Sequence, residues 1–178
     1  MSIPLRLLER LTDGVLVLDQ YALADAEAHW EGEDEEMRLR FESPRRPTLD
    51  EVRNAIRTWI AAREAGGIPN FCYAIRASGV LVGGCELRWL EKGTSSVAVS
   101  YWCYPAFRRR GFAGRALRLV LAELPSTGAS QIEAHIESEN MASRRIADRA
   151  GFTESGIALG QSPTGQMKTR IRYVKALV

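Results

Sequence analysis

Cysteine is scarce in this 178-residue chain, which contains only Cys72, Cys85 and Cys103. The number is odd and no two cysteines form a C-x-x-C pair, so the sequence argues against a disulfide framework and against a cysteine-based zinc site. All three lie in apolar stretches, where a free cysteine usually serves as a small hydrophobic side chain. We therefore expect neither a disulfide nor a bound metal.

Long hydrophobic runs are also lacking. No run in the chain approaches the ~20 apolar residues that cross a bilayer. The first ten residues include Arg6, Glu9 and Arg10, where a signal peptide would have its uninterrupted apolar core. These absences predict a soluble cytoplasmic protein without a membrane partner.

A large net charge of either sign is missing as well. Lys plus Arg total 24 and Asp plus Glu total 22, so the overall charge of +2 does not favour a nucleic-acid partner. Lysine is rare, because every basic residue except Lys92, Lys168 and Lys175 is an arginine. The charges are unevenly placed: arginines without an intervening acid occupy 108–118, and acids concentrate at 31–36.

The length and a composition of 46% hydrophobic and 26% charged residues predict one globular domain over residues 1–178. Hydrophobic periodicity and turn residues predict one strand, two helices and three strands, then a helix, a strand, a helix and a final pair of strands. The predicted strands are 14–19, 71–77, 80–90, 96–104, 130–138 and two within 152–178 around a loop near 160–166. The predicted helices are 21–30, one from the Thr48–Glu51 capping box to Gly66-Gly67, 113–124 and 140–150.

The order of these elements predicts how the strands pair. Strands 71–77 and 80–90 are joined by Ser78-Gly79, which is typical of a hairpin, and consecutive strands without helices between them favour antiparallel pairing. The β-α-β unit over 96–138 requires a parallel pair, because its helix makes a crossover. The sequence therefore predicts a mixed α/β domain, mostly antiparallel with one parallel pair, flanked by helices.

A basic turn with small residues joins strand 96–104 to the next helix. It reads Arg108-Arg-Arg-Gly111-Phe-Ala113-Gly114. The free amides and the positive dipole end of a helix make an anion site that suits phosphate. The turn matches neither G-x-x-x-x-G-K-[ST] nor G-x-G-x-x-G. Taken alone, it is equally consistent with a phosphate site and with a solvated basic turn.

Two elements together carry a family resemblance. The pattern Arg108-x-x-Gly111-x-Ala113 follows a strand, and Asn140-Met-Ala-Ser143 opens a helix that ends in Gly151-Phe152. This combination resembles the GNAT acyltransferase superfamily, and within it the branch of the ribosomal-protein N-terminal acetyltransferases. The resemblance is dense over 94–152. It implies an acetyl-CoA cosubstrate and a parallel strand pair that splays apart to admit it.

The resemblance also implies which residues bind the cosubstrate. Strand residues would pair with its pantetheine arm, the turn would hold its pyrophosphate, and the helix start would contact the arm. The implied residues are Trp102, Cys103 and Tyr104 on the strand, Arg108, Arg109, Arg110, Gly111, Phe112, Ala113 and Gly114 in the turn, and Asn140 and Ser143 on the helix. Asn140 also suits an ordinary helix N-cap, and the two roles are compatible.

The catalytic residues depart from the family pattern. Many relatives carry a tyrosine seven residues after the helix asparagine as proton donor to the thiolate, and here Ala147 stands there, so Ser143 is the candidate in its place. Some relatives place a catalytic glutamate at the position of His135, whose imidazole titrates near neutrality. The sequence slightly favours the other interpretation of His135, a structural histidine bonded to Glu133. Glu86 is a second candidate base, and a reaction without a side-chain base stays open.

The resemblance implies an acetyl-CoA-dependent N-acetyltransferase in which a primary amine attacks the thioester directly. The amine is a protein N-terminal α-amine or a small molecule, and the acids at 31–36 either attract a cationic amine or form a solvated helix end. The alternative is a CoA-binding sensor that has lost the chemistry. A nucleic-acid-binding module is not favoured. Dimers are common in the family, so a homodimer is one candidate state, and the sequence leaves the oligomeric state open.

Overall fold

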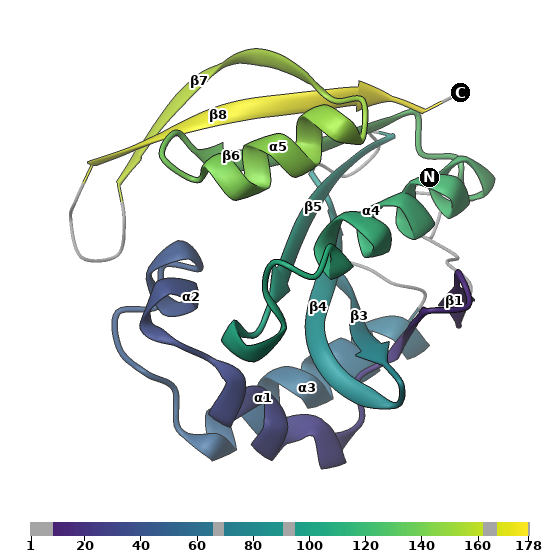
Figure 1. Cartoon of the computed structure of the whole chain (residues 1–178), viewed down its shortest axis with the longest axis vertical. Helices are drawn as coiled ribbons and strands as arrows, with labels where there is room; N and C mark the ends of the chain where they lie inside the picture. The colour runs from purple at the N-terminus through teal and green to yellow at the C-terminus, as the bar shows by residue number, and fades with distance from the viewer. Residues whose placement is uncertain (1–8, 66–69, 91–94, 162–166, 178) are drawn as a thin grey trace.

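A computed structural model describes residues 9–65, 70–90, 95–161 and 167–177. Its strands form one eight-stranded sheet in the order β1-β2-β3-β4-β5-β6-β8-β7, in which only β5 and β6 pair in parallel (Figure 1). The strands are β1 Leu11–Thr12, β2 Leu16–Gln20, β3 Asn70–Ala77, β4 Val80–Trp89, β5 Ser96–Cys103, β6 Gln131–Glu137, β7 Thr153–Gln161 and β8 Met167–Ala176. The predicted mixed sheet with one parallel pair is confirmed.

Helices cover both faces of the sheet. The α-helices are α1 Ala26–Gly32, α2 Glu35–Arg40, α3 Leu49–Glu64, α4 Phe112–Glu123 and α5 Met141–Arg149, with short 3-10 helices η1 Leu23–Asp25, η2 Pro105–Phe107 and η3 Leu124–Thr127. Leu117 and Val120 of α4 belong to the larger hydrophobic core. Val52 and Ile56 of α3 belong to a second core on the opposite face, together with Trp102 of β5. Because the family resemblance implies an amine acceptor on the side of residues 31–36, we call this opposite face the acceptor face.

Several local predictions are confirmed. Thr48 Oγ1 accepts a hydrogen bond from Glu51 N, and Glu51 Oε2 accepts one from Thr48 N, which completes the predicted capping box. Ser78 and Gly79 have φ values of 50° and 78°, as a tight two-residue hairpin turn requires. The predicted stop at Gly66-Gly67 and the loop over 162–166 lie outside the described residues.

The segment 21–40 differs from its prediction. The expected helix over 21–30 is η1 followed by α1, which continues to Gly32, and the acidic stretch holds the additional helix α2. Asp34 starts α2, because its carboxylate accepts a hydrogen bond of 2.9 Å from Met37 N. The acids of this stretch therefore serve partly as helix-start residues.

The parallel pair is short. Ser96, Val97 and Ala98 of β5 pair with Gln131, Ile132 and Glu133 of β6. In the described part of the chain the two strands do not pair beyond this point, although β4 stays paired with β5 as far as Cys103. A gap therefore opens between β5 and β6 toward the end where η2 and α4 follow (Figure 1).

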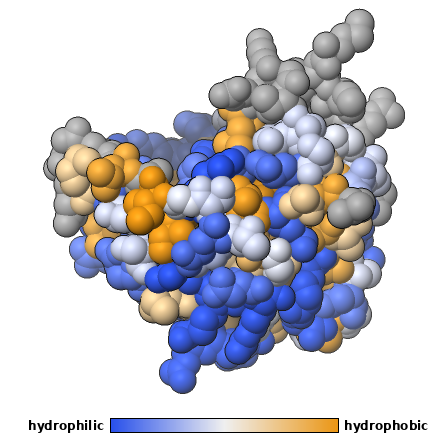
Figure 2. Space-filling view, turned by 90° about the horizontal axis from the view of Figure 1, so that it is seen from above, coloured by the Kyte–Doolittle hydropathy of each residue, from blue (hydrophilic) through white to orange (hydrophobic). Residues whose placement is uncertain are grey.

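The β7–β8 hairpin forms one end of the sheet, with β7 as its edge strand. It carries the exposed hydrophobic side chains Ile157, Leu159 and Met167. Figure 2 shows hydrophobic atoms among hydrophilic ones on the side of the molecule seen from above. Among the described residues, no helix combines the length and the apolar character that a membrane span needs.

Candidate functional site

The gap between β5 and β6 exposes one edge of the β5 backbone. Tyr104 N donates a hydrogen bond of 3.0 Å to Val82 O, so the backbone of Tyr104 faces β4. Because successive residues of a strand direct their backbone groups to opposite sides, the N–H groups of Cys103 and Tyr101 face the gap. Beyond Ala98 the described part of β6 does not pair with them. An extended, amide-containing ligand could pair with β5 there.

The turn before α4 lies at the open end of this gap. Gly111 is the N-cap of α4 and has a left-handed φ of 78°. A Cβ atom at Gly111 would meet no heavy atom within 4 Å, and one at Gly114 would meet only Ile146 Cγ2 at 3.9 Å. The two glycine positions therefore leave space beside the first turn of α4, in which the Ala113 amide is bonded to the Cys103 thiol. With the positive end of the helix dipole behind it, this space suits a phosphate-bearing group.

The side chain of Arg108 is directed toward Asp34, whereas its place in the turn suggested that it would face a bound phosphate. Its guanidinium binds both carboxylate oxygens of Asp34, at 2.7 and 2.8 Å, and Glu36 at 3.0 Å, and its Nε donates to Cys103 O at 3.3 Å. This contact lowers the pKa of the Asp34 carboxyl below its usual range and raises the pKa of Arg108. The predicted cofactor contact of Arg108 stays a prediction, but its charge is already paired with the carboxylates of Asp34 and Glu36.

The start of α5 lies across the gap from β5. Asn140 Oδ1 accepts a hydrogen bond of 3.1 Å from Ser143 N, which confirms the N-cap role of Asn140. The Tyr101 hydroxyl donates to Ser143 O at 3.2 Å and links β5 to α5. Burial raises the pKa of Tyr101, so its hydroxyl stays protonated at neutral pH. Sequence analysis did not identify Tyr101 as a site residue. Its hydroxyl reaches α5, the helix that carries the fully buried Ala147 where many relatives have a tyrosine.

His135 and Glu133 lie on the acceptor face of β6 and form a hydrogen bond of 3.1 Å. Glu133 is only 5% exposed and is held by both arms of the Arg172 guanidinium, at 2.6 and 2.7 Å. The arginine and the histidine lower the pKa of Glu133 to about 2. The hydrogen bond expected for a structural histidine is confirmed, and the base role of His135 stays a prediction.

Glu86 projects from β4 on the acceptor face. Its cross-strand partners are Cys72 and Ser100, and Cys72 belongs to the core of that face. Burial raises the pKa of the Glu86 carboxyl, which the neighbouring Arg88 lowers again in part. A half-buried carboxylate with a raised pKa is better suited to accept a proton near neutral pH than an exposed one.

Comparison with known proteins agrees with this geometry. The family model of the acetyltransferase (GNAT) domain matches residues 16–153. The chain belongs to the GNAT acetyltransferase family. No curated protein sequence matches it. The match to the family model confirms the predicted family and the prediction that the protein is an enzyme.

Solved structures show the same fold at low sequence identity. The acetyltransferase of Salmonella typhimurium that modifies the N-terminal serine of ribosomal protein L7/L12 is 16% identical, with a TM-score of 0.80 over 96% of this chain and 100% of that one. RimJ of Mycobacterium smegmatis, solved with CoA-disulfide, is 19% identical, with a TM-score of 0.76 over 94% and 84%. The microcin C7 self-immunity acetyltransferase MccE, solved with acetyl-CoA and AMP, is 16% identical, with a TM-score of 0.79 over 92% and 93%.

The acceptor face of this GNAT domain contains an aromatic cluster that sequence analysis missed. His29 Nδ1 lies 2.7 Å from the Tyr104 hydroxyl, and the Tyr21 hydroxyl donates to Gly83 O at 3.0 Å. Burial lowers the pKa of His29 to about 4, so the imidazole is neutral at pH 7. A Cβ at Gly84 would overlap the Trp102 ring and the Tyr21 hydroxyl. The paired glycines inside a strand were the available signal for this close approach.

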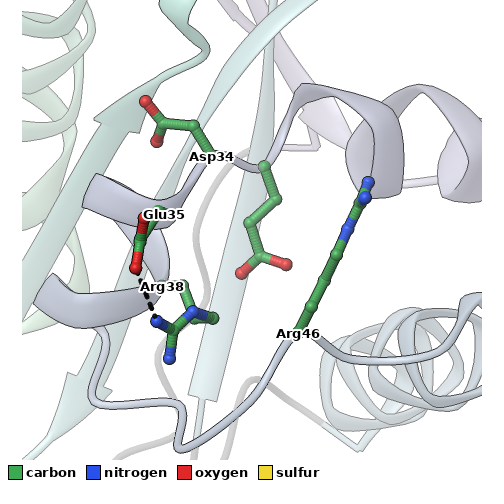
Figure 3. A pocket seen from close by; sticks show the side chains of 5 residues that line it. Asp34, Glu35, Arg38 and Arg46 are labelled. Carbon is green, nitrogen blue, oxygen red and sulfur yellow. Dashed lines mark hydrogen bonds and ion pairs between the residues drawn. The ribbon is translucent and has the colours of Figure 1, made fainter.

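Three of the acids at 31–36 of the GNAT domain line a pocket of about 270 Å³. Its walls are Glu33, Asp34, Glu35, Arg38 and Arg46, and Figure 3 shows Arg46 entering from a different segment than Glu35 and Arg38, which are bonded to each other. Glu33 Oε2 is buried and has no hydrogen-bond partner among the described residues. Burial raises the pKa of Glu33 against the effect of the two arginines. The acidic patch is therefore partly neutralised and partly enclosed.

Proposed function

We propose that this GNAT domain transfers the acetyl group of acetyl-CoA to a primary amine, either a protein N-terminal α-amine or a small-molecule amine. The observation that carries the proposal is the continuity of two features. The start of α4 lies at the end of the gap along β5, so one ligand with a phosphate end and an amide-containing arm fits both.

The residues of the site fit acetyl-CoA, which supplies an acetyl group activated as a thioester. The backbone of Arg109–Gly114 would hold the pyrophosphate, and the Cys103 backbone would pair with the pantetheine arm. Asn140 and Ser143 would border the arm from the start of α5. A ligand that has both an anionic end and amide groups would contact all of these residues. A simple phosphate would contact only those of the turn.

The chain also offers groups for the chemistry of acyl transfer. Glu86 would accept the proton of the attacking amine, since its raised pKa favours proton uptake. The gap-facing amide of Tyr101, near Cys103, would stabilise the negative oxygen that forms during attack. The Tyr101 hydroxyl and Ser143 are the protic groups that border the gap on the α5 side.

The acceptor is the less determined part of the proposal. The S. typhimurium structure is that of an enzyme that modifies an N-terminal serine, which supports a protein N-terminus as acceptor here. The acidic pocket and the unpartnered Glu33 oxygen support a cationic acceptor of either kind. The homodimer stays one candidate state, and the cytoplasmic location stays a prediction.

The decisive experiment is a thioester-consumption assay with acetyl-CoA and a panel of N-terminal peptides and small amines. The proposal predicts amine-dependent release of free CoA and an acetylated amine detectable by mass spectrometry. A protein that binds acetyl-CoA but releases no CoA with any amine would instead be the non-catalytic sensor. The N-terminal peptides and small amines in one panel separate the two acceptor classes.

Glu86→Gln is expected to lower kcat/KM for the amine at pH 7 by about 100-fold, because it removes a base without changing the size of the side chain. The pH profile of kcat/KM, measured from pH 5.5 to 9, should keep only the acidic limb that the ammonium form of the amine itself causes. His135→Ala should leave the profile unchanged and the rate within about twofold, since His135 is bonded to Glu133. The opposite pattern, with the profile altered by His135→Ala alone, would assign the base to His135.

A further inference from the structure

Helix α2 depends on polar contacts for its position. It has six residues, Glu35–Arg40, and Met37 is its only buried residue. A helix this short is marginal by itself, because the cost of nucleation is spread over few hydrogen bonds. One buried side chain gives little hydrophobic stabilisation, so the ion pairs at its two ends decide where it lies.

The C-terminal end of α2 is attached to β6 and β8. Arg40 lies 3.6 Å from Glu137 of β6, and Lys168 of β8 donates a hydrogen bond of 3.0 Å to Leu39 O. Arg170 of β8 forms an ion pair with Glu42, two residues after the end of the helix. These contacts fix the C-terminal end of α2 against β6 and β8.

The N-terminal end of α2 is attached to the turn that precedes α4. Arg108 binds Asp34 through two hydrogen bonds of 2.7 and 2.8 Å and Glu36 through one of 3.0 Å. The Asp34 carboxylate points away from Arg46, on the other side of the pocket (Figure 3). The side chains of Arg108 and Asp34 are both half-buried, and a two-pronged pair of this kind fixes orientation better than a single contact.

The position of α2 matters because the residue that follows it packs against a side chain of β5. The Phe41 ring, directly after α2, packs edge-on against the Trp102 ring at 5.3 Å. Trp102 precedes Cys103, whose backbone faces the gap. We propose that Arg108 is a positioning residue for the acceptor: it ties the cofactor turn to α2 and so holds the Phe41–Trp102 wall that the amine passes. This inference rests on the proposed function.

The kinetic test uses Asp34→Ser, Arg108→Met and the double variant. Serine at position 34 keeps an N-cap for α2 but loses the charge and the two contacts with Arg108. We expect Asp34→Ser to raise the KM for the best amine of the panel about tenfold, with kcat and the acetyl-CoA Kd within about twofold. The double variant should be no worse for the amine than the poorer single variant, because both changes remove one interaction.

Asp50→Ser is the matched control, since Asp50 stands near the start of a helix, as Asp34 does, and pairs with an arginine, Arg53, at 3.0 Å. It should leave both constants within about twofold. An equal rise in the acetyl-CoA Kd and the amine KM of Asp34→Ser would show that Arg108 serves the cofactor, and would overturn the proposal. Unchanged constants in Asp34→Ser would overturn it too.

Hydrogen exchange tests the same proposal without catalysis. In Asp34→Ser and Arg108→Met, the amides of residues 36–41 should exchange at least about fivefold faster than in the wild type, while those of α4 keep their rates. Unchanged exchange in α2 would overturn the positioning role. If the wild type acetylates no amine and the α2 amides of the variants still exchange faster, the proposed function is wrong. The finding that Arg108 links the turn to α2 is then still supported.

Discussion

Gly111→Glu is expected to abolish acetyl-CoA binding while the protein stays folded. A side chain at Gly111 has room, because a Cβ there would meet no atom within 4 Å. The new carboxylate would stand at the start of α4, where the pyrophosphate is proposed to bind, and would repel it. Opposed like charges cost several kcal/mol, which corresponds to a loss of affinity of about 100-fold or more by calorimetry.

Gly79→Glu is the matched control for this prediction. Gly79 also has a φ of 78° and also has no atom within 4 Å of a built Cβ, but it lies in the β3–β4 turn. Both variants should therefore lose about 1 kcal/mol of stability from the left-handed backbone, and their melting temperatures should fall by similar amounts. If Gly111→Glu binds acetyl-CoA as Gly79→Glu does, the turn before α4 is not the anion site.

Arg172→Met is expected to lower the free energy of unfolding by about 2 kcal/mol at pH 7, because it leaves the buried Glu133 carboxylate without its guanidinium. The loss is smaller than for a fully buried pair, since Arg172 is itself partly exposed and water can approach. Urea unfolding of both proteins measures the difference. Arg45→Met is the control, because Arg45 makes an equally two-pronged pair with an exposed carboxylate, Glu51, and should change stability much less.

The effect of Arg172→Met should depend on pH in a defined direction. The folded-state pKa of Glu133 is about 2, below its ordinary value of 4.5. The ion pair therefore stabilises the fold fully above about pH 4.5 and loses this contribution as the pH falls toward 2. The difference between wild type and variant should shrink over that window. A difference that is constant with pH would assign the loss to packing of the arginine stem instead.

Local patterns predicted most of the fold. The capping box at Thr48–Glu51, the Ser78-Gly79 turn and the left-handed Gly151 after α5 were each predicted from a few adjacent residues, because caps and tight turns satisfy backbone groups within one turn of chain. The β-α-β order predicted the parallel pair, since a helical crossover permits no other pairing in one sheet. The short helix α2 was missed because its six residues show no apolar stripe.

The candidate site was predicted in part. The turn Arg108–Gly114 and the N-cap Asn140 were found because their spacing matches a family pattern. Tyr101 and His29 were not found, since the hydroxyl of one reaches Ser143 and the imidazole of the other reaches Tyr104, 42 and 75 residues away along the chain. No local pattern records such contacts.

The sequence by itself determined the class of the domain, its order of elements and the turn suited to an anion, because hydrophobic period, caps and glycine positions act over a few residues. Only the tertiary structure decided which way the charged side chains face. Arg108, one of three consecutive arginines beside a phosphate-type turn, is directed to Asp34 at the start of a different helix. The reason is that an ion pair forms wherever the folded backbone brings opposite charges within reach, and that distance is set by packing of the sheet and helices rather than by separation in the chain.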